Sequence, residues 1–212
     1  RPDGFMLPKS TSGKDVQLLA RMIEDQAREA DLASYAPSII AIATETAASI
    51  FGLGSYGECA ETLVALCWGA EDLSADLGAL SVFDNNGQYT PPYQLARSLC
   101  LMGARAADLD PIDGIFADFR DMEGLRKSCE EALRDGFTGK LAIHPAQLEI
   151  INGVFTPSSE DIHAAKAIIK AFEAAGNAGV IGFEGKMLDR PHLLRARKLI
   201  KRAQLYASSA DQ

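Results

Sequence analysis

Two carboxylates, each placed just after an apolar segment, are the residues of this sequence best suited to chemistry. Glu45 follows the run "SIIAIAT" (38–44), and Asp72 closely follows "TLVALCW" (62–68) in the next unit of the chain. If these runs are neighbouring parallel strands, both side chains stand close together at the same end of a sheet. Two like charges that close raise each other's pKa unless a cation neutralises them, and such oxygen ligands suit Mg²⁺.

A structural role for the same two acids is equally open on the residues alone. "TETAA" and "EDLSADL" would each place an acid at the N-terminus of a helix, where carboxylates cap free N–H groups and meet the positive end of the helix dipole. Glu71 and Asp76 are weaker candidates for a metal site. Asp76 lies one turn after Asp72, where we expect it to face solvent.

A glycine pattern upstream of Asp72 suggests a nucleotide site that its surroundings exclude. Residues 52–57, "GLGSYG", match the GxGxxG pattern of dinucleotide-binding loops. That loop must join a strand directly to a crossover helix, but "TETAASIF" separates these glycines from the preceding strand. Only "ECAETL" remains before the next strand, which is too short for the helix. We expect a flexible loop at the rim of the sheet.

Three further polar residues follow the later strand-like runs. Asp118 and Arg120 lie in "FADFRD", and His144 lies in "GKLAIHP". A His–Asp proton relay is one interpretation, but the sequence offers no nucleophile beside it. The favoured interpretation is that His144, held in extended backbone before Pro145, is a hydrogen-bonded residue at the rim.

These residues need a scaffold, and the chain alternates strand-like and helix-like segments. The strand-like runs are continuous and apolar, which is typical of a parallel sheet covered on both faces. They are residues 4–8, 38–44, 62–68, 113–119 and 139–145. The helix-like segments are residues 13–30, 91–108, 121–136, 158–176 and 189 onward, with a β-like arm at 179–188.

The strand ends favour a barrel over an open sheet. All five runs end in ionisable residues, which are Lys9, Glu45, Glu71 with Asp72, Asp118 with Arg120, and His144. In a TIM (β/α) barrel these ends converge on one mouth, whereas an open sheet uses only its switch point. We therefore predict an α/β fold containing about five of the eight βα units of a TIM barrel. Residues 1–157 are predicted as the barrel domain and 158–212 as a C-terminal extension of helix, β-arm and helix.

Composition excludes several classes of partner. The 212 residues carry 21 basic and 29 acidic side chains, a net charge of −8, which argues against a non-specific nucleic-acid binder. No apolar run reaches the length of a membrane span. The four cysteines form no CxxC pair, so we expect reduced thiols and a cytoplasmic protein, or a mitochondrial-matrix protein if the source is eukaryotic. The three histidines are too dispersed for a zinc motif.

Seven segments together resemble the citrate lyase β-subunit-like family of CoA-ester lyases. In chain order they are "GFMLPKS", "ATETAASI", "WGAEDLSADLG", "GQYTPPYQLARS", "FADFRD", "GFTGKLAIHPAQLEIINGVFTPS" and "GKMLDRPHL". They run nearly from end to end of the chain. "DFRD" and "AIHPAQ" are more similar to the stand-alone malyl-CoA and citramalyl-CoA lyases than to the citrate lyase subunit that acts on an acyl-carrier protein.

The resemblance implies a TIM barrel whose first strands carry a CoA-proximal segment and a substrate-binding arginine, neither of which is in this sequence. Glu45 and Asp72 match the two Mg²⁺ ligands of the family, and Glu45 also faces the substrate. The strand end at 143–145 (Ile143, His144, Pro145) matches a segment that contacts the thioester or CoA. Asp189 in "KMLDRP" matches an aspartate on a C-terminal arm that reaches a neighbouring subunit, usually in a trimer.

The implied activity is Mg²⁺-dependent cleavage of a 3-hydroxyacyl-CoA thioester between Cα and Cβ. A substrate of the citramalyl-CoA or malyl-CoA type would give acetyl-CoA and pyruvate or glyoxylate. The metal polarises the keto-acid carbonyl, and Asp189 is the expected general acid–base. The alternatives are a malyl-CoA thioesterase, a citryl-acyl-carrier lyase β-subunit, a non-catalytic CoA-binding subunit and a metal-dependent pyruvate aldolase. A homo-oligomer, trimer or hexamer, is expected.

Overall fold

The computed structural model describes residues 1–32, 34–59, 61–176 and 178–210, and the chain divides into two compact units. The first unit spans Arg1–Ile151 and holds a parallel sheet with its connecting helices. The second spans Asn152–Gln212 and holds an antiparallel hairpin between two long helices. Helix α6 (Leu148–Phe155) crosses the boundary between them.

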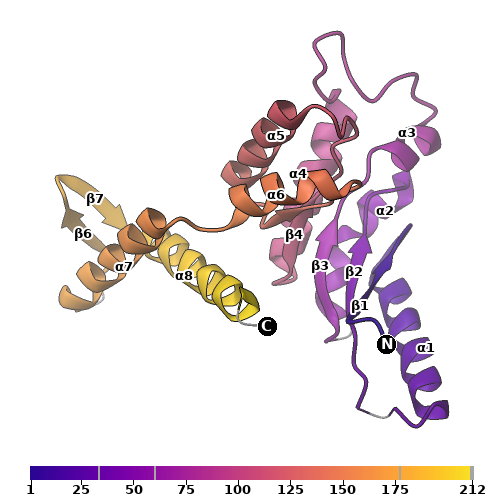
Figure 1. Cartoon of the computed structure of the whole chain (residues 1–212), viewed down its shortest axis with the longest axis horizontal. Coiled ribbons are helices and arrows are strands. Elements are labelled where there is room, and N and C mark those ends of the chain that lie inside the picture. Colours follow the sequence, from indigo (N-terminus) through magenta and orange to yellow (C-terminus); the bar gives the residue numbers. More distant parts are fainter. Residues whose placement is uncertain (33, 60, 177, 211–212) are drawn as a thin grey trace. The chain divides into compact units, whose positions relative to one another are not determined.

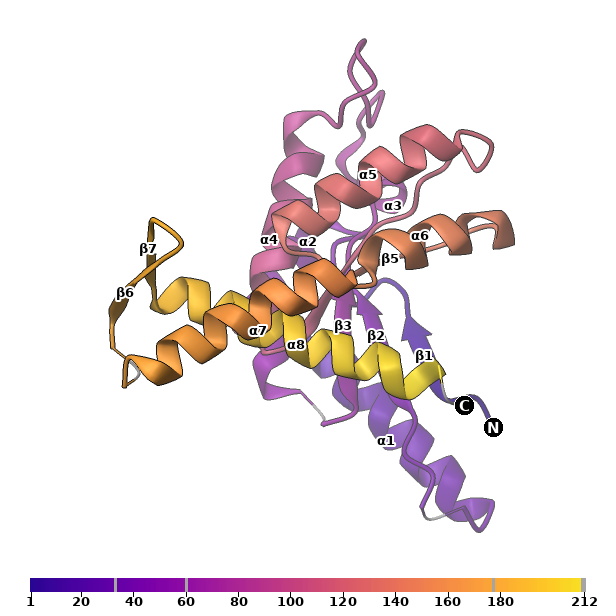
Figure 2. The ribbon, with the colours of Figure 1, turned by 60° about the vertical axis from the view of Figure 1, so that its left-hand side comes forward.

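The first unit is built on five parallel strands that lie side by side in chain order (Figures 1 and 2). The strands are β1 (Gly4–Leu7), β2 (Ser38–Ile42), β3 (Leu63–Cys67), β4 (Asp110–Asp113) and β5 (Gly139–Lys140). The helices between them are α1 (Gly13–Glu29), α2 (Ala47–Gly52), the 3₁₀ helix η1 (Leu53–Glu58), α3 (Glu71–Leu77), α4 (Pro91–Ala106) and α5 (Met122–Asp135). The predicted α/β fold with a parallel sheet is confirmed. Within the described residues the sheet is open, with β1 and β5 at its edges.

The central strands owe their position to apolar burial. The last residues of β2 and β3, Ile42 and Cys67, are register partners, so the chain leaves both strands at the same level. Enclosed side chains from the sheet and from α4 form the core around them, and burial of such surface is the main stabilising term in folding. They include Ile39, Leu66, Cys67, Tyr93 and Cys100.

The fourth strand lies earlier in the chain than the sequence predicts. The apolar run 113–119 is the expected strand, but β4 is Asp110–Asp113, and residues 114–118 form a loop. Pro111 and two aspartates make this segment unlike a strand, because proline cannot donate to a sheet. The carbonyl of Pro111 instead accepts from the Thr138 N–H at 2.9 Å, which joins β4 to the short β5.

The glycine-rich segment 52–57 is helical, so the prediction of a flexible loop is wrong. Helix α2 ends at Gly52 and η1 follows directly. A side chain at position 52 would lie 2.0 Å from the carbonyl oxygen of Thr11, so glycine allows this turn to pack tightly against the start of α1. These glycines do not form the strand-to-helix turn of a dinucleotide-binding fold.

The second unit consists of α7 (Ser159–Ala174), a hairpin of β6 (Val180–Phe183) and β7 (Lys186–Asp189), and α8 (Arg190–Ala210). The hairpin is the predicted β-arm. Glu184 and Gly185 form its two-residue turn and both have positive φ, as a type I′ turn requires. The small core of the unit joins helix and hairpin through Phe172, Ile181, Leu188 and Leu193.

The described residues can be examined for disulfides and for membrane-spanning helices. The four cysteines all lie within them and form no disulfide. None of the helices described is both long and apolar enough to span a bilayer.

Candidate functional site

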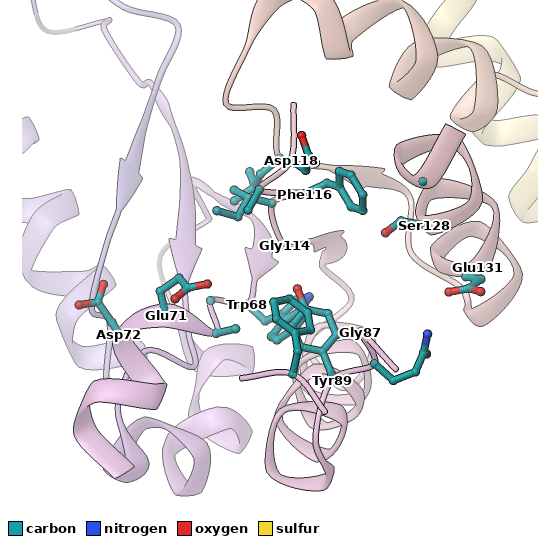
Figure 3. A pocket seen from close by; sticks show the side chains of 18 of the residues that line it. Trp68, Glu71, Asp72, Gly87, Tyr89, Gly114, Phe116, Asp118, Ser128 and Glu131 are labelled. Atoms are coloured by element: carbon teal, nitrogen blue, oxygen red, sulfur yellow. The ribbon is translucent and has the colours of Figure 1, made fainter. Parts of the chain in front are cut away.

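A cavity of about 650 Å³ opens beside the loops that follow β2, β3 and β4 (Figure 3). Its volume is in the range of small-molecule sites. The lining comes from Glu45, residues 68–72, residues 87–89, residues 114–118 and one face of α5. Figure 3 shows Glu71 and Asp72 on one side of the cavity and Ser128 and Glu131 on the opposite side.

Glu45 is a buried carboxylate at the carboxyl end of β2. Its side chain accepts a hydrogen bond from the backbone N–H of Lys9, the residue that follows the β1 strand and Pro8. A side chain at Gly69 would lie 3.1 Å from the Cγ of Glu45, so glycine leaves room for this carboxylate. Burial raises the pKa of Glu45; the Lys9 hydrogen bond opposes that rise, and the nearby Asp72 charge adds to it.

Asp72 lies in the first turn of α3 and shares Lys9 with Glu45. The Lys9 Nζ stands 2.9 Å from the Oδ1 of Asp72, and the hydrogen bond from Lys9 lowers the pKa of that carboxyl. The predicted carboxylate pair is therefore present, and one lysine contacts both members. Lys9 is recognisable in the sequence as a charged residue after a strand, but its contacts with both acids are visible only in the structure.

The helix-capping interpretation fits Asp72 in part and Glu45 not at all. Thr46 is the N-cap of α2 and accepts from the Ser49 N–H at 3.1 Å, so Glu45 is left for another role. Asp76 is exposed, as the sequence predicts, and its Oδ2 also accepts from the Ala47 N–H at 2.7 Å. The acid expected at the surface is the one that ties α3 to the start of α2.

A second buried carboxylate, Asp113 at the end of β4, was missed by sequence analysis. Its Oδ2 lies 2.7 Å from the Lys140 Nζ, and its Oδ1 accepts from the Arg97 Nε at 2.9 Å and the Trp68 Nε1 at 2.6 Å. Burial disfavours the charged form of Asp113, but Lys140 and Arg97 outweigh it and hold its pKa below the usual value. Nothing in the local spacing pointed to this network, because its cations come from α4 and β5.

Aromatic side chains form the wall of the cavity above this network. Trp68 packs edge-on against Tyr89 with ring centroids 5.0 Å apart, and Tyr89 contacts Phe83 at 4.7 Å. Burial, together with the Asp113 charge, raises the pKa of Tyr89 to about 12, so its phenol stays neutral. The segment between Phe83 and Tyr89 is a hairpin loop whose turn is held by the Asp84 carboxylate, which accepts from the N–H groups of Asn86 and Gln88.

His144 and Asp118, the residues considered for a proton relay, each contact other residues. The His144 ring stacks on Phe119 at 4.6 Å, and its Nδ1 accepts from the Ala146 N–H at 3.1 Å. Asp118 accepts from the Arg120 N–H at 3.0 Å and lines the cavity. His144 therefore stands as the hydrogen-bonded rim residue that the sequence favoured.

Residues 143–145, which the sequence predicts as a strand end, lie beyond β5 and are held in place through Gln147. The Ile143 N–H donates to the Gln147 Oε1 at 2.9 Å, and the Gln147 amide donates to the Phe116 carbonyl at 2.9 Å. The fully buried Gln147 thus ties the turn at Pro145 to the loop after β4. The Ile143 side chain remains exposed.

Asp189 belongs to the second unit, at the junction of β7 and α8. Its Oδ1 lies 2.5 Å from the Nδ1 of His192, one turn into the helix, and both side chains are partly exposed. The hydrogen bond with His192 lowers the pKa of Asp189.

The donor set at the first pair suits Mg²⁺. Within the described residues there is no group of three or more His, Cys, Asp or Glu side chains that could enclose a metal. Mg²⁺ does not need one, since it is commonly held by one or two carboxylates with waters and substrate oxygens. Glu45 and Asp72 supply such a pair, already drawn around the Lys9 cation.

The chain is similar to several known proteins. The chain is 34% identical over 213 residues to a (3S)-malyl-CoA thioesterase of Cereibacter sphaeroides, covering 98% of this chain and 67% of the relative. It is 31% identical to the mitochondrial citramalyl-CoA lyase of Rattus norvegicus, covering 94% of this chain and 60% of that protein. The chain thus spans about two thirds of the length of these relatives.

A solved structure has a similar fold. Protein CitE from Mycobacterium tuberculosis, crystallised with magnesium, acetoacetate and coenzyme A, superposes with a TM-score of 0.72. The identity is 31%, over 94% of this chain and 67% of that one. Residues 1–145 match the sequence family of the HpcH/HpaI aldolases and citrate lyases. The chain therefore belongs to the HpcH/HpaI aldolase/citrate lyase family.

Proposed function

We propose that this chain is part of a Mg²⁺-dependent carbon–carbon lyase that cleaves a 3-hydroxyacyl-CoA thioester of the citramalyl-CoA or malyl-CoA type. The products would be acetyl-CoA and pyruvate or glyoxylate. The observation that carries the proposal is the Glu45–Asp72 pair, which lies just beyond the ends of the adjacent strands β2 and β3, beside a cavity of about 650 Å³. Relatives named citramalyl-CoA lyase and a magnesium-bound neighbour support this choice.

The metal would be held by Glu45 and Asp72, and when bound it would supply a Lewis acid for the keto-acid oxygens. The protein's own contribution begins with those two carboxylates, which are oriented before any ligand arrives. Lys9 fixes Glu45 through its backbone and Asp72 through its ammonium group. Trp68 and Tyr89 form an apolar wall that would exclude water from the reacting carbons.

Proton transfer is assigned to Asp189 on the basis of the resemblance. Cleavage requires a base to remove the β-hydroxyl proton and an acid to return a proton to the acetyl carbon. Asp189, a partly exposed carboxylate hydrogen-bonded to His192, would act first as the base. The carbonyl and amide groups of residues 143–145 are the proposed contacts of the thioester end of CoA.

The arm that carries Asp189 would serve a neighbouring copy in a homo-oligomer, a trimer or a hexamer. This proposal also rests on the resemblance. Its support in the chain is that β6, β7 and α8 pack around a core of their own. An arm that is folded in itself can present a carboxylate to a second subunit without being remodelled.

The test is a product assay on the full-length protein with citramalyl-CoA and malyl-CoA. Pyruvate or glyoxylate should form only with Mg²⁺, and Asp72→Asn should abolish metal-dependent turnover while the circular dichroism spectrum is unchanged. Glu130→Gln, an exposed change of the same charge on α5, is the matched control. Full activity in Asp72→Asn would show that the metal site is elsewhere.

A second candidate, thioester hydrolysis, is favoured by the relatives named (3S)-malyl-CoA thioesterase, at up to 34% identity. The same assay separates the two activities. Free malate with CoA would indicate hydrolysis, whereas acetyl-CoA with glyoxylate would indicate carbon–carbon cleavage.

A further inference from the structure

We propose that Lys9 is an internal counter-ion of the metal-binding pair, which weakens the binding of a divalent cation until an anionic substrate is present. The inference rests on the proposed metal site at Glu45 and Asp72. Lys9 contacts both carboxylates. Its backbone N–H donates to Glu45, and its Nζ lies 2.9 Å from Asp72.

The backbone of Lys9 is held in a conformation that is unfavourable for lysine. Its φ is +54°, in the left-handed region that costs free energy for any residue with a Cβ. The next residue fixes it there, because the Ser10 N–H donates to the Ile42 carbonyl at 3.1 Å, and the Tyr56 hydroxyl donates to the Ser10 Oγ at 2.8 Å. Strain of this kind persists where the surrounding structure over-determines it, and it is concentrated at functional sites.

This backbone conformation turns the Lys9 N–H toward Glu45 while the side chain extends to Asp72. A glycine would adopt the same φ without strain and would keep the first contact. It would lose the second. What lysine adds at this position, compared with glycine, is the contact between its ammonium group and Asp72.

The charges around Glu45 and Asp72 indicate what the Lys9 ammonium group does. Glu45 and Asp72 together carry two negative charges when ionised, and Lys9 returns one positive charge. A divalent cation approaching Asp72 meets this ammonium beside one of the two carboxylate oxygens. It must repel or displace the ammonium, so metal binding without substrate is weakened. A 2-keto acid brings its own carboxylate, which offsets the excess positive charge and gives the ammonium a new partner.

Metal and anionic ligand should therefore bind with positive coupling. The coupling follows from differential interaction and acts equally on both ligands. The Lys9–Asp72 pair is partly exposed, with side-chain exposures of 62% and 46%, so water and salt moderate it. An effect of about tenfold on metal affinity is the scale expected for one charge at this distance in a partly solvated site.

The experiment is isothermal titration of Mn²⁺ and Mg²⁺ into the full-length protein at low salt, with circular dichroism as the folding check. Lys9→Met should bind metal about tenfold more tightly than wild type. Lys9→Gly, which tolerates the φ of +54°, should do the same. Lys14→Met, an exposed lysine on α1, removes the same charge and should change the affinity less than about twofold. Pyruvate or glyoxylate should tighten metal binding more in wild type than in either Lys9 variant.

Two failures are distinguishable. If the Lys9 variants bind metal as wild type does, or more weakly, Lys9 is not a competing cation, while the metal site itself stands. If wild type, the Lys9 variants and Asp72→Asn all fail to bind Mn²⁺ with or without keto acid, the proposed metal site is wrong and the role of Lys9 falls with it.

Discussion

The buried pair of Lys140 and Asp113 is expected to be a major source of stability, and Lys140→Met tests it. Both side chains are only 3% exposed, and their charged atoms are 2.7 Å apart. Removing one partner of such a pair costs about 3–5 kcal/mol, because the other charge is left in a dry site. Because Arg97 and Trp68 still donate to Asp113, the expected loss of unfolding free energy is about 3 kcal/mol.

The assay is urea unfolding followed by the fluorescence of Trp68, the single tryptophan of the sequence, whose indole donates to Asp113. With an m-value of about 2 kcal/mol/M, the midpoint should fall by about 1.5 M urea. Combining Lys140→Met with Asp113→Asn removes both charges of the pair. The double variant should therefore lose less than the sum of the single variants, by about 2 kcal/mol.

The pH dependence gives a second check on the same carboxylate. Because the folded-state pKa of Asp113 is lowered, its ionisation stabilises the protein above the ordinary value of 3.8, and this contribution is lost as the pH falls through the folded-state value. The stability gap between wild type and Asp113→Asn should be constant near neutrality and narrow in acid. If Lys140→Met unfolds within about 0.5 kcal/mol of wild type, the pair is solvated and is not a major source of stability.

Three further outcomes are expected. Trp68→Phe removes part of the cavity wall and the donor to Asp113, so the KM for the proposed acyl-CoA substrate should rise more than kcat falls in steady-state kinetics. His192→Ala should raise the pKa of Asp189, and the acidic limb of the kcat profile should move to higher pH, whereas an unmoved limb would remove Asp189 from that role. Mixing inactive Asp189→Ala with inactive Asp72→Asn should restore part of the activity if the arm serves a neighbouring subunit, and no recovery after subunit exchange would contradict that arrangement.

The elements that the sequence predicted best are those whose signal is local. Continuous apolar runs identified β2 and β3, and the type I′ turn at Glu184–Gly185 lies within the predicted arm. The position of β4 was predicted incorrectly, because burial of this strand depends on residues that are distant in the sequence. Asp113 can occupy a buried strand only because Arg97, 16 residues away, and Lys140, 27 residues away, neutralise it. Such pairing leaves no trace in the periodicity of the segment itself.

The candidate site was predictable to a similar extent. Glu45 and Asp72 were found because each follows a recognisable strand, and parallel pairing brings successive strand ends together. The contribution of Lys9 could not be found in that way. Its part depends on a left-handed backbone conformation that is favourable for glycine and that lysine adopts here under the constraint of Ser10.

The balance of charge distinguishes the two carboxylate clusters of the sheet. Asp113 contacts two cations, Lys140 and Arg97, and an indole donor, and Arg97 also pairs with Asp135, so the carboxylates of this cluster are neutralised by the protein and no further cation is attracted. Glu45 and Asp72 are two carboxylates sharing one lysine. The negative charge that the protein leaves uncompensated therefore lies at the second cluster, beside the cavity. A buried carboxylate whose charge is neutralised by protein cations supports the fold. Two carboxylates that share a single lysine keep one negative charge uncompensated and are suited to bind a cation from solution.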